Sequence, residues 1–213
     1  MDLKEHIRSI KDYPKKGILF RDITTLIKNE KAFSETIDQI IERSKKYKID
    51  KIAAIESRGF VFASAVSYLL KKPFILLRKK NKLPADVYSI DFELEYGSAT
   101  IEMHKDSIEP NENILIIDDL IATGGTAEAA AKLIEISSGK VSCFIFVGEM
   151  KWPLPWRGRK YTSLCLYLVF SISSDGFPQG VLIEISSLSL NSSTSYKPLP
   201  PIIANLFIVI INI

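Results

Sequence analysis

Residues 113–126 have the sequence Asn-Ile-Leu-Ile-Ile-Asp-Asp-Leu-Ile-Ala-Thr-Gly-Gly-Thr, and this stretch decides the fold. Four consecutive branched apolar residues, Ile114 to Ile117, predict a strand that is buried on both faces, as in a parallel sheet. Two adjacent carboxylates end the apolar run and a short loop with paired glycines follows. Ala127 to Ile136 is then rich in strong helix formers, so the predicted order is strand, acidic pair, glycine loop and helix.

The glycine loop, residues 122–126, is predicted to lie at a helix N-terminus, where free N–H groups and the helix dipole favour an anion. Its glycines lack a Cβ, so a phosphate can approach the main chain closely, and its two threonines add hydroxyl donors. The carboxylates of Asp118 and Asp119 would repel that phosphate. They suit a neutral diol instead, such as the 2′- and 3′-hydroxyls of a ribose.

Other phosphate loops fit this stretch less well. A Walker loop needs a lysine after its last glycine, where Thr126 stands, and the dinucleotide fingerprint G-x-G-x-x-G is absent. An acidic turn that caps a helix would explain a lone Asp-Asp or Gly-Gly pair, but not the whole combination. That combination resembles the phosphoribosyltransferase family, whose signature is an apolar strand, two acidic residues and then Ala-Thr-Gly-Gly-Thr.

A second polar segment follows the predicted buried strand at residues 51–55 and precedes an apolar helix at residues 61–70. Polar groups at the C-terminal end of such a strand lie where open α/β sheets bind ligands. Ser57 as a helix N-cap is the simpler explanation. The Ser57-Arg58-Gly59 core also resembles the family's pyrophosphate loop, which implies that Arg58 lies near both diphosphate and base.

Two further segments have a simple structural explanation each, and each also matches a segment of the family. Residues 78–84 are a basic run, which is usually a solvated loop. In the family similar residues reach the diphosphate, partly across a dimer interface, and Arg78 and Lys82 match them. Residues 87–103 predict a β-hairpin, and Glu95-Tyr96-Gly97 within it resembles the mobile catalytic hood of the family.

Residues 18–23, Ile-Leu-Phe-Arg-Asp-Ile, predict a short strand packed on the core. They also resemble the base-binding segment of family members that use adenine, where an apolar side chain covers the purine and main-chain groups bind its edge. The resemblance implies that Leu19 and Arg21 flank the base. Lys16 and Thr25 stand where the family usually has proline.

Composition excludes several other classes of protein. A net charge of +3 is too small to indicate nucleic-acid binding, and two cysteines make no disulfide framework, which fits a reducing cytoplasm. Residues 1–10 place Leu3, Ile7 and Ile10 on one helical face, so we expect an amphipathic helix rather than a targeting segment. The apolar run at residues 202–213 is too short to span a bilayer, which takes about 20 residues.

Strands alternate with helices, which predicts an α/β fold with a mainly parallel sheet flanked by helices, similar to the type I phosphoribosyltransferase fold. A small N-terminal hood is expected over about residues 1–25. The resemblance is clear to about residue 150, and we predict one phosphoribosyltransferase domain over residues 1–170. Residues 171–213 are serine-rich, then proline-rich and apolar, and are expected to form a divergent, poorly ordered tail.

The reaction implied by the resemblance is adenine plus 5-phosphoribosyl 1-diphosphate (PRPP) giving AMP and diphosphate, in a cytoplasmic homodimer. Mg²⁺ would bridge substrate oxygens without a direct protein ligand. The residues expected to contact PRPP are Ser57, Arg58, Arg78, Lys82, Asp118, Asp119, Ala122, Thr123, Gly124, Gly125 and Thr126. Those expected to contact adenine are Leu19, Arg21 and Arg58. The residues expected to be catalytic are Arg58, Tyr96 and Glu95, with Glu95 handling the purine proton.

Two alternatives remain. The first is a regulator that keeps the sugar-phosphate site without chemistry; such proteins carry an added helix-turn-helix, for which residues 1–12 are too few. The second is a transferase for another nucleobase, which the segments at residues 20–22 and 94–97 argue against.

Overall fold

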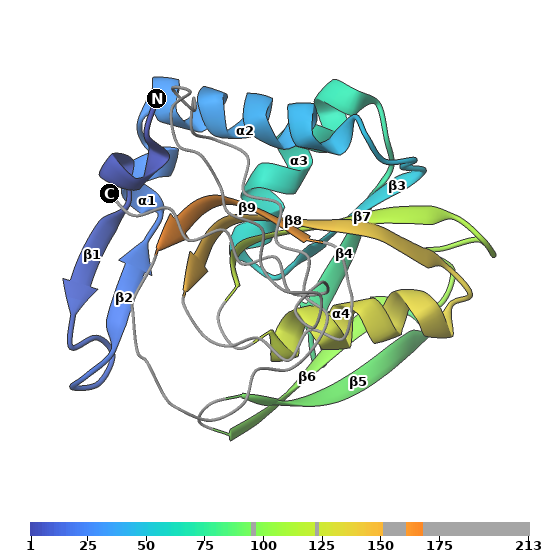
Figure 1. Cartoon of the computed structure of the whole chain (residues 1–213). Helices are drawn as coiled ribbons and strands as arrows, with labels where there is room; N and C mark the ends of the chain where they lie inside the picture. Colours follow the sequence, from blue (N-terminus) through green and yellow to red (C-terminus); the bar gives the residue numbers. More distant parts are fainter. Residues whose placement is uncertain (95–96, 122–123, 151–160, 168–213) are drawn as a thin grey trace, which may run out of the picture.

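The computed structural model describes residues 1–94, 97–121, 124–150 and 161–167 (Figure 1). Its main sheet has seven strands in the order β5-β6-β4-β3-β7-β8-β9. All neighbours from β4 to β9 pair in parallel, and β6 pairs antiparallel with both β4 and β5. The strands are β3 (Lys51–Ile55), β4 (Phe74–Lys79), β5 (Val87–Leu94), β6 (Gly97–His104), β7 (Asn113–Ile121), β8 (Lys140–Met150) and β9 (Tyr161–Tyr167).

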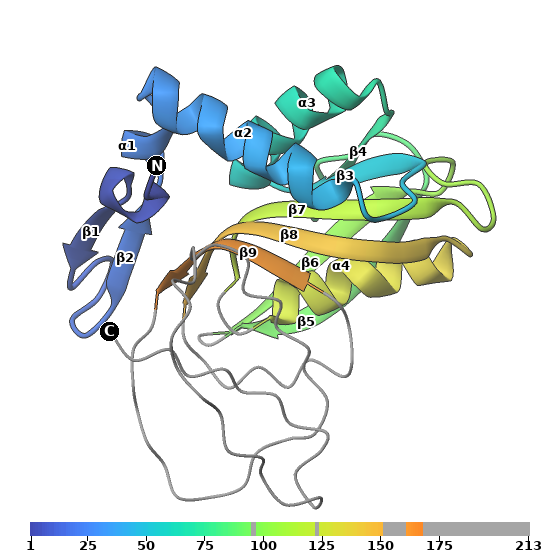
Figure 2. The same ribbon diagram turned by 45° about the horizontal axis from the view of Figure 1, so that its top comes forward.

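Helices cover both faces of this sheet. Figure 2 shows α2 (Glu30–Ser44) and α3 (Arg58–Leu70) on one side and α4 (Gly125–Ile136) on the other. The β5–β6 hairpin extends the sheet at its edge and packs against α4. The fold is therefore the predicted α/β arrangement of a mainly parallel sheet flanked by helices.

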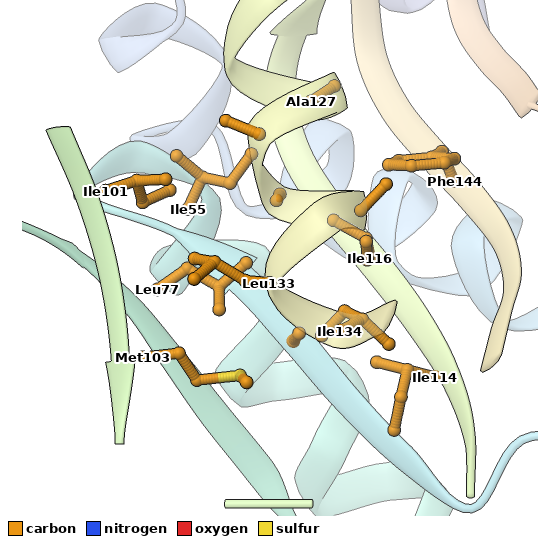
Figure 3. Close-up of a cluster of buried hydrophobic side chains, with 14 of the residues drawn as sticks. Ile55, Leu77, Ile101, Met103, Ile114, Ile116, Ala127, Leu133, Ile134 and Phe144 are labelled. Atoms are coloured by element: carbon orange, nitrogen blue, oxygen red, sulfur yellow. The ribbon is translucent and has the colours of Figure 1, made fainter. Parts of the chain in front are cut away.

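The central strand β7 is buried on both faces, as its apolar run predicts. Ile114 and Ile116 face α4, in the cluster drawn in Figure 3, whereas Leu115 and Ile117 face α2 and α3. All four side chains are fully buried. The alternation fixes the strand in the middle of the molecule and sets the position of the acidic residues that follow.

The small N-terminal sheet forms a separate layer beyond the carboxyl ends of β8 and β9 (Figures 1 and 2). Asp22 ties its two strands together: its carboxylate accepts hydrogen bonds from the Arg8 guanidinium and from the backbone N–H of Thr24. The Thr24 and Arg8 hydrogen bonds lower the pKa of Asp22 to about 2. The elements of this layer are η1 (Leu3–His6), β1 (Arg8–Lys11), β2 (Leu19–Asp22) and α1 (Thr24–Ile27).

Two local predictions were wrong. Residues 1–10 do not form one helix, because the 3-10 helix ends at His6 and β1 begins at Arg8 to pair with β2. Leu3 and Ile7 are both buried as predicted, but an extended chain after the short helix satisfies their spacing equally well. The strand β2 belongs to the small sheet rather than to the main core, and Leu19 is only half-buried.

The expected tail at residues 171–213 lies outside the described residues. Within them, β9 pairs with β8 and closes one edge of the sheet, inside the predicted domain of residues 1–170. No helix in the described part of the chain has the length and apolar character needed to cross a membrane.

Candidate active site at the carboxyl edge of the sheet

The acidic pair lies inside β7, because the strand continues to Ile121 rather than ending at the first carboxylate. Asp119 is 3% exposed, and its backbone N–H donates to Oδ1 of Asp118 at 2.9 Å. Burial raises the pKa of both carboxyl groups, and the neighbouring Asp119 charge raises that of Asp118 further. The Arg58 guanidinium opposes this rise at Asp119.

Arg58 connects the acidic pair to the N-terminal sheet. It is the first residue of α3, and its Nε lies 3.0 Å from Oδ2 of Asp119. Its guanidinium carbon also lies 5.6 Å from the ring centroid of Phe20 on β2, within cation–π range. The contact with Asp119 is an ion pair without hydrogen-bond geometry, so Oδ2 accepts no hydrogen bond from the described residues. That oxygen is therefore a candidate acceptor for a ligand hydroxyl.

Gly59 belongs to the Ser57-Arg58-Gly59 core, but sequence reasoning assigned it no role of its own. A Cβ at this position would lie 2.8 Å from the carbonyl oxygen of Ile117 and 3.0 Å from Oδ1 of Asp118. The missing side chain therefore lets the first turn of α3 rest directly on β7 beside the acidic pair. Its place immediately after Ser57-Arg58 was the available signal.

The N-terminus of α4 has the properties expected of an anion site. Gly124 adopts the left-handed conformation (φ 85°) that favours glycine, and no side chain caps the helix. The backbone N–H groups of the first turn, including those of Gly125 and Thr126, have no partner within the helix itself. Ala122 and Thr123, which complete the predicted phosphate loop, lie outside the described residues.

The basic run begins at the C-terminal end of β4, where Arg78 has three hydrogen bonds. Its Nε and Nη2 donate to the carboxylate of Glu56 at 3.1 and 3.4 Å, and its Nη1 donates to the carbonyl oxygen of Lys82 at 3.0 Å. The backbone N–H of Lys79 also donates to Glu56. Burial raises the pKa of Glu56, but these hydrogen bonds outweigh it and leave the pKa below its ordinary value. Sequence reasoning missed Glu56.

The structure brings together only part of the predicted set. Ser57 precedes α3 but makes no side-chain cap, so the simpler N-cap explanation is not supported. Leu19 and Arg21 lie on β2 on either side of Phe20, and Arg21 donates to the Ser9 hydroxyl. Glu95 and Tyr96, which stand between β5 and β6 in the sequence, lie outside the described residues.

The carboxylate oxygens of the acidic pair belong to the ligand class that Mg²⁺ prefers. No group of three histidine, cysteine, aspartate or glutamate side chains comes together in the described part of the chain. By the chemistry of their oxygens, Asp118 and Asp119 fit Mg²⁺.

Comparison with known proteins gives consistent matches. A family model described as the phosphoribosyl transferase domain matches residues 22–182, which extends past the boundary predicted at residue 170. The chain is 77% identical over 146 residues to the adenine phosphoribosyltransferase of Pelagibacter ubique, covering 68% of this chain and 83% of the relative. It is 52% identical over 174 residues to that of Methylobacillus flagellatus, covering 78% and 98%.

Solved structures match in the same way. The crystal structure of adenine phosphoribosyltransferase from Thermoanaerobacter pseudethanolicus aligns with a TM-score of 0.74 and 42% identity, covering 78% of this chain and 98% of the other. The enzyme from Saccharomyces cerevisiae, complexed with an imino-altritol bisphosphate and adenine, aligns with a TM-score of 0.66 and 36% identity, covering 70% and 86%.

Proposed function

Because the chain belongs to the phosphoribosyltransferase family, we propose that it transfers the 5-phosphoribosyl group from PRPP to adenine, giving AMP and diphosphate in purine salvage. One observation carries the proposal beyond family membership. Arg58 contacts both Asp119 of the acidic pair and the Phe20 ring of the segment that resembles an adenine site. The sugar side and the base side of the site therefore meet at a single side chain.

The acidic pair is proposed to hold the ribose. Asp118 and Asp119 accept hydrogen bonds from the 2′- and 3′-hydroxyls, while residues 122–126 hold the 5′-phosphate at the N-terminus of α4. Because the sugar is held at its hydroxyls and at its 5′-phosphate, the anomeric carbon is fixed between the diphosphate and the base. Displacement at this carbon builds positive charge on the sugar. Nearby buried carboxylates also favour that positive charge over the neutral ground state.

The diphosphate is proposed to lie against Ser57, Arg58, Arg78 and Lys82. Their backbone N–H groups and cationic side chains stabilise the charge that grows on the leaving group. Mg²⁺ supplies further charge neutralisation when it is bound to substrate oxygens.

Adenine is proposed to lie beside Leu19 and Arg21, with the Arg58 guanidinium at its other edge. Main-chain groups of β2 discriminate adenine by accepting from its exocyclic amine and donating to a ring nitrogen. Glu95 handles the proton that the purine loses, and Tyr96 closes over the site with it.

We further propose that the protein is a homodimer that associates through the outer face of α3. Large apolar side chains are exposed there at Val61, Tyr68 and Leu69, and Leu76 is exposed on neighbouring β4. The resemblance implies a second copy of this chain as the occupant, with Arg78 near that interface. Tyr68 is 71% exposed, which is costly for an aromatic ring unless it is covered.

Tyr68→Glu combined with Leu69→Glu is expected to convert the dimer into a monomer, because it places two charges in an apolar interface. Analytical ultracentrifugation measures the mass of the particle. The matched control is Ile136→Glu, an exposed apolar residue on α4 that should leave the dimer intact. A double variant that still sediments as a dimer would contradict the assignment of the interface to the outer face of α3.

The bounds of the catalytic domain and the cellular location are also proposals. We propose that residues 1–170 are the catalytic domain, since β9 completes the sheet at residues 161–167. A cytoplasmic location is supported by the cysteine content, because two cysteines make no disulfide framework, which fits a reducing compartment.

Adenine-dependent release of diphosphate from PRPP tests the proposed reaction against the regulator alternative. With Mg²⁺ present, the protein should release diphosphate only when adenine is added, in amounts equal to the AMP formed. A regulator would bind PRPP and release no diphosphate with or without adenine.

A further inference from the structure

Glu102 is a buried carboxylate that the proposed mechanism does not use. It lies on β6, only 5% exposed, between Ser89 of β5 and Arg78 of β4 in the register of the sheet. Among the described residues, Glu102 forms no ion pair. Burial of a carboxylate is unfavourable without compensation, so its hydrogen bonds indicate what it does.

Those hydrogen bonds join two segments that are both assigned to the site. Oε2 of Glu102 accepts from the backbone N–H of Asn81 at 2.9 Å, inside the basic loop that follows β4. Oε1 accepts from the Ser89 hydroxyl at 3.3 Å, on β5 of the β5–β6 hairpin. One carboxylate thus links the basic loop to the catalytic hairpin.

The basic loop turns through a left-handed residue at Asn81. Asn81 has a φ of 63°, in the left-handed region where asparagine is the most tolerated of the non-glycine residues together with aspartate. Its neighbour Lys82 accepts a hydrogen bond from Arg78 at its carbonyl oxygen, so the backbone conformation at Asn81 affects the position of the Arg78 guanidinium. The hydrogen bond that the Asn81 N–H donates to Glu102 supports the turn in the conformation in which the contact between Arg78 and Lys82 forms.

We propose that Glu102 is a positioning residue that fixes the basic loop for the diphosphate of PRPP and ties it to the hairpin. The inference rests on the proposed assignment of Arg78 and Lys82 to the diphosphate. It predicts that loss of the Glu102 hydrogen bonds weakens ligands that carry a diphosphate and spares ligands that lack one.

The test is calorimetric titration of the full chain with PRPP, and separately with AMP, in the presence of Mg²⁺ and without adenine. Glu102→Met keeps the length of the side chain and removes both acceptors. This variant is expected to bind PRPP about tenfold more weakly and to bind AMP with unchanged affinity. Glu102→Gln should restore PRPP binding, because its oxygen can accept from Asn81 while its amide donates to the Ser89 hydroxyl.

Three further variants complete the design. Asp91→Leu, which removes an exposed carboxylate from the same hairpin, should bind both ligands as the wild type does. Lys82→Ala tests the underlying assignment, and an unchanged PRPP affinity there would mean that the basic loop is not the diphosphate site. Ser89→Ala removes only the hairpin-side hydrogen bond, and should weaken PRPP to a smaller extent than Glu102→Met.

The inference is overturned if Lys82→Ala weakens PRPP and Glu102→Met does not. It is also overturned if Glu102→Met lowers the affinities for PRPP and AMP equally. The same holds if Glu102→Gln binds PRPP as weakly as Glu102→Met does. Should Glu102→Met fail to fold by circular dichroism, Ser89→Ala decides the question, and an unchanged PRPP affinity in that variant contradicts the proposal.

Discussion

Asp118→Asn combined with Asp119→Asn is expected to lower AMP formation by about 10²–10⁴-fold and to leave the fold intact. Hydrogen bonds to a charged acceptor contribute about 1.5–3 kcal/mol each, and about 1.4 kcal/mol corresponds to a factor of ten in rate. Both side chains lie on β7 but outside the two apolar clusters, so the amides should be accommodated without repacking.

Steady-state kinetics with varied PRPP measures this effect. The matched control is Asp38→Asn, an exposed aspartate on α2, which should retain full activity. Near-normal AMP formation by the double variant would contradict the assignment of the acidic pair to the ribose.

The raised pKa of Asp118 gives the same substitution an effect on stability with a definite sign. Its native pKa lies above its value in the unfolded chain, so the native state binds more protons between the two values. Stability therefore falls as the pH rises across that window. Asp118→Asn removes this slope, and its melting temperature near pH 7 should exceed that of the wild type. The KM for PRPP of the wild type should fall over the same window, as the carboxylate ionises.

Glu95→Gln is expected to lower kcat by about 10²–10⁴-fold, the usual range for general acid–base assistance, with a much smaller change in KM. The reason is that Glu95 is proposed to act only once the hairpin has closed, in the transition state. Glu95 lies outside the described residues, so the assignment depends on the Glu95-Tyr96-Gly97 motif and its place in the hairpin.

Saturating adenine and PRPP isolate kcat in this experiment. Glu93→Gln, an exposed glutamate on β5 of the same hairpin, is the matched control and should behave as the wild type. An unchanged kcat in the Glu95 variant would contradict the proposed role of Glu95 in proton transfer.

The parts of the fold that sequence predicts well are those set by local periodicity. The apolar run at residues 114–117 specifies a doubly buried strand, because only a central parallel strand buries both faces. The hairpin at residues 87–103 and the helices after each polar loop follow from the same kind of pattern. Residues 1–10 show the limit, because Leu3 and Ile7 are buried by either a helix or a short turn followed by a strand.

The site residues found only in the structure depend on contacts between distant segments. Glu56 binds Arg78, 22 positions away, and Glu102 binds Asn81, 21 positions away. Single charged residues at strand ends carry no periodic signal, and their partners are set by the register of β3, β4 and β6. The same holds for Gly59, whose importance depends on the closeness of α3 to β7.

The most direct measurement of the central claim is the rate of AMP formation from PRPP and adenine, compared with nucleotide formation from hypoxanthine, guanine and uracil under the same conditions. The account predicts Mg²⁺-dependent AMP formation with adenine and rates at least about 10²-fold lower with the other bases, since the site's main-chain groups would be left unpaired by them. Equal rates with another base, or no AMP from adenine by the folded protein, would contradict it.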